Sequence, residues 1–169
     1  GNQWVAAECD VSIRPGWFYH PEEDDKVKTV DQLTDLYYRS VGHNATLLLN
    51  FPVDRNGLIH PTDSLNAVSF HLRVQKELAD NLLSSAKVSA SDERGGQFKV
   101  RAVTDGKYDT YWATNDGVTT ADLTFTFSQP TKMNRVMIQE YIPLGQRVKS
   151  FVVEYKKGDQ WLSVKCNEE

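Results

Sequence analysis

The stretch Ala45-Thr46-Leu47-Leu48-Leu49-Asn50 decides how the first half of the chain folds. Three consecutive leucines are typical of a strand that is buried on both faces of a parallel sheet. Before this strand, Thr29 and Gln32 have the spacing of a capping box, and the apolar residues that follow recur at helical spacing until Gly42. The sequence therefore predicts a helix followed by a buried strand.

The same alternation continues on both sides of this helix and strand. A first strand is predicted at about residues 10–13, and a second helix begins at the capping residues 61–64. Strands that alternate with helices predict a parallel sheet, in which functional loops follow the carboxyl ends of the strands. Trp17 and Asn50 are therefore expected at one open face. The expected apolar stripe of the second helix consists of Leu65, Val68, Leu72, Leu78 and Leu82.

The hydrophobic pattern changes near residue 85, and we place a domain boundary there, between residues 1–85 and 86–169. After it, residues 123–127 alternate strictly between apolar and polar, and residues 135–141 and 98–103 are further expected strands. Lys157-Gly158-Asp159 is a hairpin turn. With no helix expected after residue 85, the second half is predicted to be an antiparallel sandwich or barrel.

Composition and charge exclude several classes of partner. The 169 residues carry a net charge of -4 without a basic stripe, so nucleic acid is not an expected partner. The longest apolar run, residues 45–53, is far shorter than the ~20 residues that span a bilayer, so no membrane partner is expected. The two cysteines, Cys9 and Cys166, are interpreted as free thiols.

Neither half of the chain is expected to form a complete fold. Two βα units do not close a parallel barrel, which takes ~250 residues, and the second half has few strands for a sandwich. We therefore interpret the sequence as a fragment of a larger protein. Open sheet edges favour pairing with another copy, so self-association is also an expectation.

Three motifs in the first half resemble those of one enzyme family. Cys9–His20 reads CDVSIRPGWFYH, Tyr37–Asn50 reads YYRSVGHNATLLLN, and Arg55–Asp63 reads RNGLIHPTD. In this order they resemble the last part of the catalytic barrel of glycoside hydrolase family 29, the α-L-fucosidases, over about residues 3–83. The resemblance is to the branch that prefers α-1,3/1,4-linked fucose.

The second half resembles a discoidin-like (coagulation factor type C) β-sandwich, a module related to carbohydrate-binding modules. The motifs that carry this resemblance are Asp109–Thr114, DTYWAT, and Ile138–Val148, IQEYIPLGQRV. The fold class implied is α/β plus all-β: the last βα units of a (β/α)8-type barrel, then an antiparallel jelly-roll sandwich, both incomplete. Related modules hold a structural calcium, for which the candidates here are Asp105, Asp109 and Thr114. The alternative is an Asx turn without metal, and no other cofactor is expected.

The family resemblance implies a retaining mechanism in which one carboxylate is the nucleophile and a second is the acid and base. Neither family motif for these carboxylates is present, so the chain alone is expected to be inactive while its parent hydrolyses a fucosylated glycan. The alternative is a non-catalytic carbohydrate-binding or interaction module. By analogy with such enzymes, the expected location is periplasmic or secreted.

Four residues are candidates for substrate binding. Trp17 suits the apolar C–H patch and methyl group of fucose, and Phe18 is next to it; the alternative is that they are core aromatics. Arg14 either binds a sugar hydroxyl or forms a buried ion pair that positions the loop. Glu8 shares a strand face with Asp10, which favours a supporting role near the site.

The acidic run and the histidines are not expected to form a site. The acidic run of residues 22–25 is expected to be a solvated face. His20, His43, His60 and His71 show no spacing typical of metal ligands.

Overall fold

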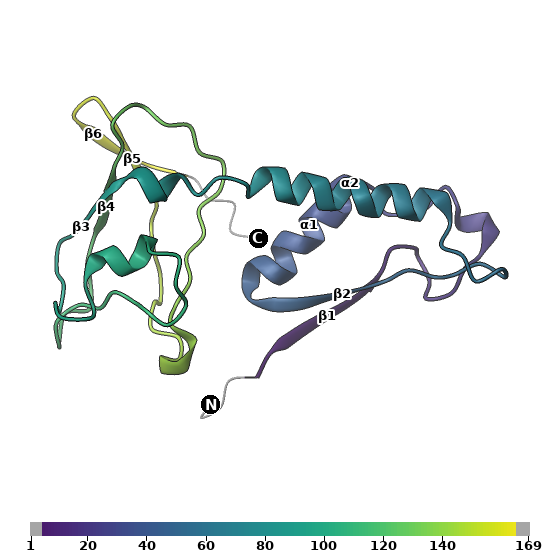
Figure 1. Cartoon of the computed structure of the whole chain (residues 1–169), viewed down its shortest axis with the longest axis horizontal. Helices are drawn as coiled ribbons and strands as arrows, with labels where there is room; N and C mark the ends of the chain where they lie inside the picture. Colours follow the sequence, from purple (N-terminus) through teal and green to yellow (C-terminus); the bar gives the residue numbers. More distant parts are fainter. Residues whose placement is uncertain (1–4, 165–169) are drawn as a thin grey trace. The chain divides into compact units, whose positions relative to one another are not determined.

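The computed structural model describes residues 5–164, and the chain divides into two compact units, Gly1–Ala79 and Asp80–Glu169 (Figure 1). The division falls after the second long helix, and the predicted boundary at residue 85 lies a few residues beyond it. Cys9 is half-buried, and the interpretation of Cys166 lies outside the described residues.

The first unit is built from two βα units. Its elements are β1 (Ala7–Ser12), η1 (Pro21–Glu23), α1 (Val30–Ser40), η2 (Val41–His43), β2 (Ala45–Asn50) and α2 (Pro61–Glu77). β1 and β2 pair in parallel from Ala7 opposite Ala45 to Ser12 opposite Asn50. The predicted parallel pairing is thus confirmed, and the carboxyl ends of both strands lie together.

Local signals set the limits of α1 as the sequence predicts. The Gln32 amide donates to Thr29 Oγ1 at 3.3 Å, and the Thr29 amide donates to Gln32 Oε1 at 2.9 Å, which completes the capping box. After η2, Asn44 takes a left-handed conformation with φ 64° and donates its amide to the Val41 carbonyl. The chain thereby turns directly from the helix into β2.

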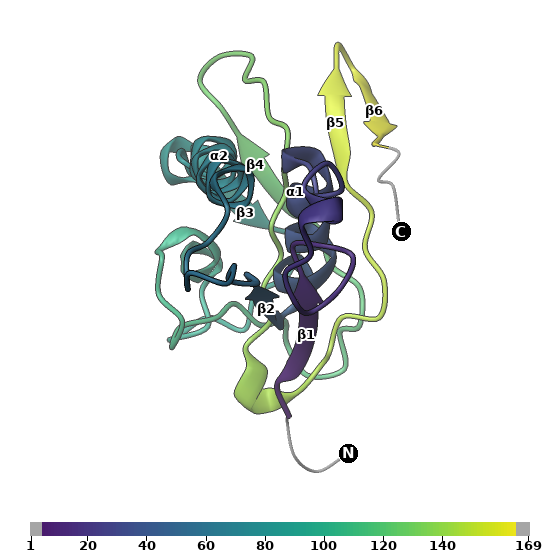
Figure 2. The ribbon, with the colours of Figure 1, turned by 90° about the vertical axis from the view of Figure 1, so that its right-hand side faces the viewer.

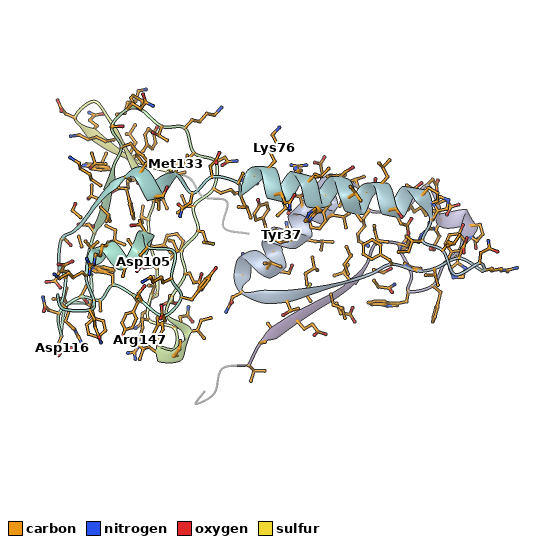
Figure 3. The ribbon with its side chains drawn as sticks, viewed as in Figure 1. Tyr37, Lys76, Asp105, Asp116, Met133 and Arg147 are labelled. Atoms are coloured by element: carbon orange, nitrogen blue, oxygen red, sulfur yellow. The ribbon has the colours of Figure 1, made fainter. Side chains whose placement is uncertain are left out.

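One face of the strand pair carries the apolar core. Ile13, Val27 and Leu33 are buried there, with Leu36, Leu49, Phe51 and Phe70 packed against them. Tyr37 of α1 contacts Phe70 of α2 edge-on, with the ring centroids 6.1 Å apart (Figure 3). α1 and α2 therefore close over the same face of the sheet.

The opposite face of the strand pair is not covered by the described residues. The prediction that β2 is buried on both faces is wrong for this unit, because Leu48 is 52% exposed. Successive side chains of a strand point to opposite faces, so Leu48 lies on the face of its register partner Asp10, away from the helices.

The orientation of α2 also differs from the prediction. Leu65, Val68 and Leu72 are 65%, 57% and 58% exposed, while Asp63 is fully buried. The inward face of α2 combines Asp63, which pairs with Arg14 in the loop after β1, with the apolar Phe70, which packs against the core. α2 ends at Glu77, so the remaining leucines of the predicted stripe lie outside it.

The second unit has two short antiparallel sheets (Figure 2). Its elements are η3 (Leu82–Ser85), β3 (Lys87–Ala90), η4 (Val100–Thr104), β4 (Leu123–Thr126), η5 (Ile142–Leu144), β5 (Glu154–Lys157) and β6 (Gln160–Ser163). β3 pairs with β4, and β5 pairs with β6 across a turn in which Gly158 has φ 62°. The strand at residues 123–127 and the hairpin are confirmed.

Three predictions in the second unit are wrong. Residues 100–104 form a short 3-10 helix, η4, instead of a strand, and residues 135–141 form no strand. η4 also contradicts the expectation of no helix after residue 85. Its first amide, that of Val100, donates to the Glu93 carboxylate at 2.7 Å, which favours a helical turn over continued extension.

Candidate functional site

Two exposed aromatic side chains follow the carboxyl end of β1. Trp17 is 51% exposed and Phe18 is 78% exposed. They lie in the loop between β1 and α1, which leaves the sheet at the same end as the loop between β2 and α2 (Figure 1). The loop placement that the sequence predicts for Trp17 and Asn50 is therefore observed, and neither aromatic side chain is a core residue within this unit.

Asn50, the last residue of β2, ties the aromatic loop to the strand ends. Its Nδ2 atom donates to the Trp17 carbonyl and to Ser12 Oγ, each at 3.1 Å. Its own carbonyl accepts from the Ile13 amide at 3.0 Å. One amide side chain thus joins the last residue of β1, the last residue of β2 and the backbone of the loop.

Arg14 lies beneath the aromatic loop and is fully buried. Its Nε and Nη2 atoms donate to the two oxygens of Asp63 at 2.8 and 2.9 Å, and Nη2 also pairs with Asp24 at 2.9 Å. The hydrogen bond to Asp63 is the main cause of the raised pKa of Arg14. Of the two alternatives for Arg14, the structure shows the buried ion pair. Because the Arg14 side chain is fully buried, it has no exposed donor for a direct hydrogen bond to a sugar.

A second layer of contacts surrounds Asp24. The Tyr19 hydroxyl donates to Asp24 Oδ2 at 3.4 Å, and His60 Nε2 lies 3.5 Å from the same oxygen. The Arg14 guanidinium lies 4.6 Å from the centre of the Tyr19 ring, an attractive cation–π geometry. The expectation of a solvated acidic run is wrong at Asp24, because this buried arginine attracts its carboxylate. Burial is the main cause of the raised pKa of Tyr19, and Asp24 adds to it.

Lys28 fixes the start of the same loop. Its Nζ atom donates to the Ser12 carbonyl at 2.7 Å and to the Arg14 carbonyl at 3.3 Å. Sequence analysis missed both Lys28 and Asp63. Asp63 is in the first turn of α2, where the helix dipole alone would explain an acidic residue. Only its position opposite an arginine in another loop reveals its second role.

Glu8 lies apart from the aromatic pair. It is exposed on the uncovered strand face, and Asp10 shares that face, as predicted. Ser12 lies four positions after Glu8, which is about 13 Å along an extended strand. The structure therefore does not bring Glu8 and Trp17 together, and substrate binding by Glu8 stays a prediction.

The candidate calcium ligands of the second unit make local hydrogen bonds. Asp105 accepts from the Lys107 amide at 2.9 Å and from Thr110 Oγ1 at 2.8 Å (Figure 3), and the Lys107 contact is the main cause of its lowered pKa. Thr114 Oγ1 donates instead to the Val118 carbonyl at 3.0 Å. Asp109 makes no hydrogen bond with another described residue. The contacts of Asp105 are those of an Asx turn. The three residues do not assemble a calcium site, which stays a prediction.

The aromatic residues near this turn pack against one another. Tyr111 stacks on Tyr141 with centroids 4.5 Å apart, and Phe98 lies 5.0 Å from Tyr111. Trp112 is half-buried, and its Nε1 atom donates to the Asp92 carbonyl at 3.1 Å. Trp112 is therefore a structural residue of this unit.

The described residues contain neither a metal-binding cluster nor a membrane-spanning helix. Residues 5–164 contain no group of three or more histidine, cysteine or acidic side chains arranged to hold a metal ion. Over the same residues, no helix has the length and apolar character needed to cross a membrane.

Comparison with known proteins follows the division into two units. Residues 86–169 match the F5/8 type C domain. This discoidin-like match covers the unit that contains the Asx turn and the aromatic stack.

Relatives that extend over both units are α-L-fucosidases by name. The chain is 39% identical over 168 residues to a rice (Oryza sativa subsp. japonica) protein assigned as α-L-fucosidase 1, covering 97% of this chain and 32% of that protein. It is 39% identical over 160 residues to α-L-fucosidase 1 of Arabidopsis thaliana, covering 93% and 31%. The chain thus spans about a third of the length of these relatives.

Solved structures give the same result. A Bacteroides thetaiotaomicron protein assigned as an α-L-fucosidase is 44% identical, with a TM-score of 0.90 over 98% of this chain and 36% of that one. A Ruminococcus gnavus GH29 fucosidase in complex with fucose is 35% identical, with a TM-score of 0.66 over 73% of this chain and 25% of that one.

Proposed function

We propose that this chain is part of a retaining α-L-fucosidase of glycoside hydrolase family 29. In this proposal the first unit supplies the last βα units of a (β/α)8-type barrel, and the second unit belongs to a discoidin-like sandwich. The observation that carries the proposal is the exposed Trp17–Phe18 pair, held by Asn50 at the strand ends of a chain similar to named fucosidases over both units.

The loop after β1 would form one wall of the fucose pocket. Fucose has an apolar C–H patch and a methyl group, which pack well on an aromatic side chain. Trp17 and Phe18 are the aromatic side chains that the loop exposes. In a retaining mechanism the nucleophile and the acid–base group are two carboxylates about 5–5.5 Å apart. We assign both to another part of the longer protein, so this chain alone would be inactive.

The natural partner of the longer protein would be a glycan with terminal α-1,3- or α-1,4-linked fucose, at a periplasmic or extracellular location. The test is release of fucose from a Lewis-type trisaccharide. We expect no release by the 169-residue chain and release by a longer protein that includes the preceding barrel residues. Absence of release from both would refute the proposal.

Two matched variants of the longer protein locate the sugar pocket. Trp17→Ala removes an aromatic residue that is 51% exposed, and Trp161→Ala removes one that is 52% exposed but lies on β6 of the other unit. We expect Trp17→Ala to raise KM for the trisaccharide and Trp161→Ala to leave it unchanged. Equal effects of the two substitutions would contradict the assignment of the pocket to the loop after β1.

The match of residues 86–169 to the F5/8 type C domain favours a second candidate function, non-catalytic carbohydrate binding. Glycan binding that persists after deletion of residues 1–85 would support it, provided that circular dichroism shows the remaining residues to be folded. Glycan binding that is lost on Trp17→Ala would instead assign recognition to the first unit.

A further inference from the structure

Packing does not explain the position of the Trp17–Phe18 pair. Both side chains are more than half exposed. Gly16, just before them, has no atom within 4 Å of where a Cβ would lie. An exposed loop of this kind would sample several positions unless polar contacts fixed its backbone.

Two backbone carbonyls, those of Trp17 and His20, each accept a hydrogen bond from a side chain outside the segment between them. The Trp17 carbonyl accepts from Asn50 Nδ2 at 3.1 Å, and the His20 carbonyl accepts from Arg14 Nη1 at 3.4 Å. The segment that carries Trp17, Phe18 and Tyr19 is therefore held at both ends.

Each donor is fixed by an element of secondary structure, Asn50 as part of β2 and Arg14 through its contact with α2. Asn50 ends β2, and its backbone carbonyl accepts from the Ile13 amide at 3.0 Å. Arg14 is fully buried and is joined to Asp63, in the first turn of α2, by two hydrogen bonds of 2.8 and 2.9 Å. A bidentate pair of this kind fixes the plane of the guanidinium group.

We propose that Asn50 and Arg14 are positioning residues, which set sugar affinity by clamping the backbone at Trp17 and at His20, and so fix Trp17 and Phe18, without touching the sugar. This inference rests on the proposed function. An aromatic wall contacts the bound sugar in the ground state and the transition state alike. Loss of its position is therefore expected to raise KM and to leave kcat nearly unchanged.

The decisive variants are at Asn50, because Arg14 is buried and its replacement threatens folding. Asn50→Ala removes both donated hydrogen bonds. Asn50→Asp keeps the shape and can accept from the Ser12 hydroxyl, but it places an acceptor against the Trp17 carbonyl. The matched control is Asn66→Ala, which removes an Asn Nδ2 bond of 3.0 Å to the Lys28 carbonyl, away from the aromatic pair.

In the longer protein that releases fucose, we expect both Asn50 variants to raise KM about five- to tenfold, as the loss of one such hydrogen bond allows. We expect kcat to stay within about twofold. A variant that merely unfolds part of the protein would lower kcat at constant KM. Unchanged KM in both Asn50 variants, or an equal rise in Asn66→Ala, would overturn the proposal.

A second readout does not need fucose. In protein labelled with 5-fluorotryptophan, the Trp17 resonance is identified by its loss in Trp17→Phe. We expect this resonance to shift or broaden in both Asn50 variants and to stay unchanged in Asn66→Ala. An unchanged resonance in the Asn50 variants refutes the clamp itself. If the wild type releases no fucose, the proposed function fails, and with it the effect on sugar affinity, whereas this spectrum still decides whether the clamp exists.

Discussion

Removing one member of the Arg14–Asp63 pair should strongly destabilise the first unit. Both side chains are fully buried, and Arg14 contacts both oxygens of Asp63. Arg14→Met leaves a buried carboxylate without its partner, a change that typically costs about 3–5 kcal/mol. The free energy of unfolding of a unit of about 79 residues is about 4–12 kcal/mol. The substitution should therefore remove a large part of the stability.

The assay is urea unfolding of the 169-residue chain, followed by tryptophan fluorescence and far-ultraviolet circular dichroism. The matched control is Arg39→Met. Arg39 is 55% exposed and pairs with Asp35 one helical turn earlier, a kind of contact worth about 0.3–0.5 kcal/mol. The double variant Arg14→Met/Asp63→Leu should be less destabilised than the sum of the two single variants, because neither partner is left buried and charged. Equal costs for Arg14→Met and Arg39→Met, or strict additivity at Arg14 and Asp63, would refute this reasoning.

Three further predictions concern local contacts. Thr29→Ala should lower the free energy of unfolding of the first unit by about 1 kcal/mol, since it removes the capping box of α1, and urea titration would show no change if the cap were unimportant. The hydrogen bond from the Leu58 amide is the main cause of the lowered pKa of Asp54. This hydrogen bond is present above the unfolded pKa and should be lost as pH falls through the folded pKa, below about pH 4. A protection factor of the Leu58 amide that falls with pH in the wild type, but not in Asp54→Asn, would show this. Trp112→Phe should lower the thermal midpoint of the second unit in calorimetry, because it removes the bond to the Asp92 carbonyl; an unchanged midpoint contradicts the structural role.

The parts of the fold that could be predicted are those decided within a few residues. The capping box at Thr29 and the hairpin turn at Gly158 depend on near neighbours, and both are present. The wrong predictions involve distant partners. Leu48 is exposed because its side of the sheet has no covering element among the described residues of the first unit. Leu65 is exposed because α2 turns Asp63 and Phe70 inward instead. Hydropathy shows which residues are apolar, but not which apolar face a neighbour covers.

The candidate site shows the same limit. The exposed position of Trp17 follows from its place after a strand of a parallel pair. The partner of Arg14 could not be predicted, because Asp63 lies 49 residues later and each residue has an ordinary local explanation. The ion pair of Asp24 could not be predicted for the same reason, because its neighbours in sequence are acidic and its partner Arg14 lies in another part of the loop.

The burial of Asp63 in α2 has a consequence for how this helix would tolerate random mutation. In most surface helices, the apolar positions are constrained and the polar positions vary freely. In this chain, Asp63 is buried against Arg14, whereas Leu65 and Leu72 are more than half exposed. A saturation library of α2, selected for folding of this chain, should therefore reject changes at the aspartate and accept polar replacements at the leucines. The same library made in the longer protein would reveal whether a neighbouring element covers the leucines, because their tolerance would then disappear.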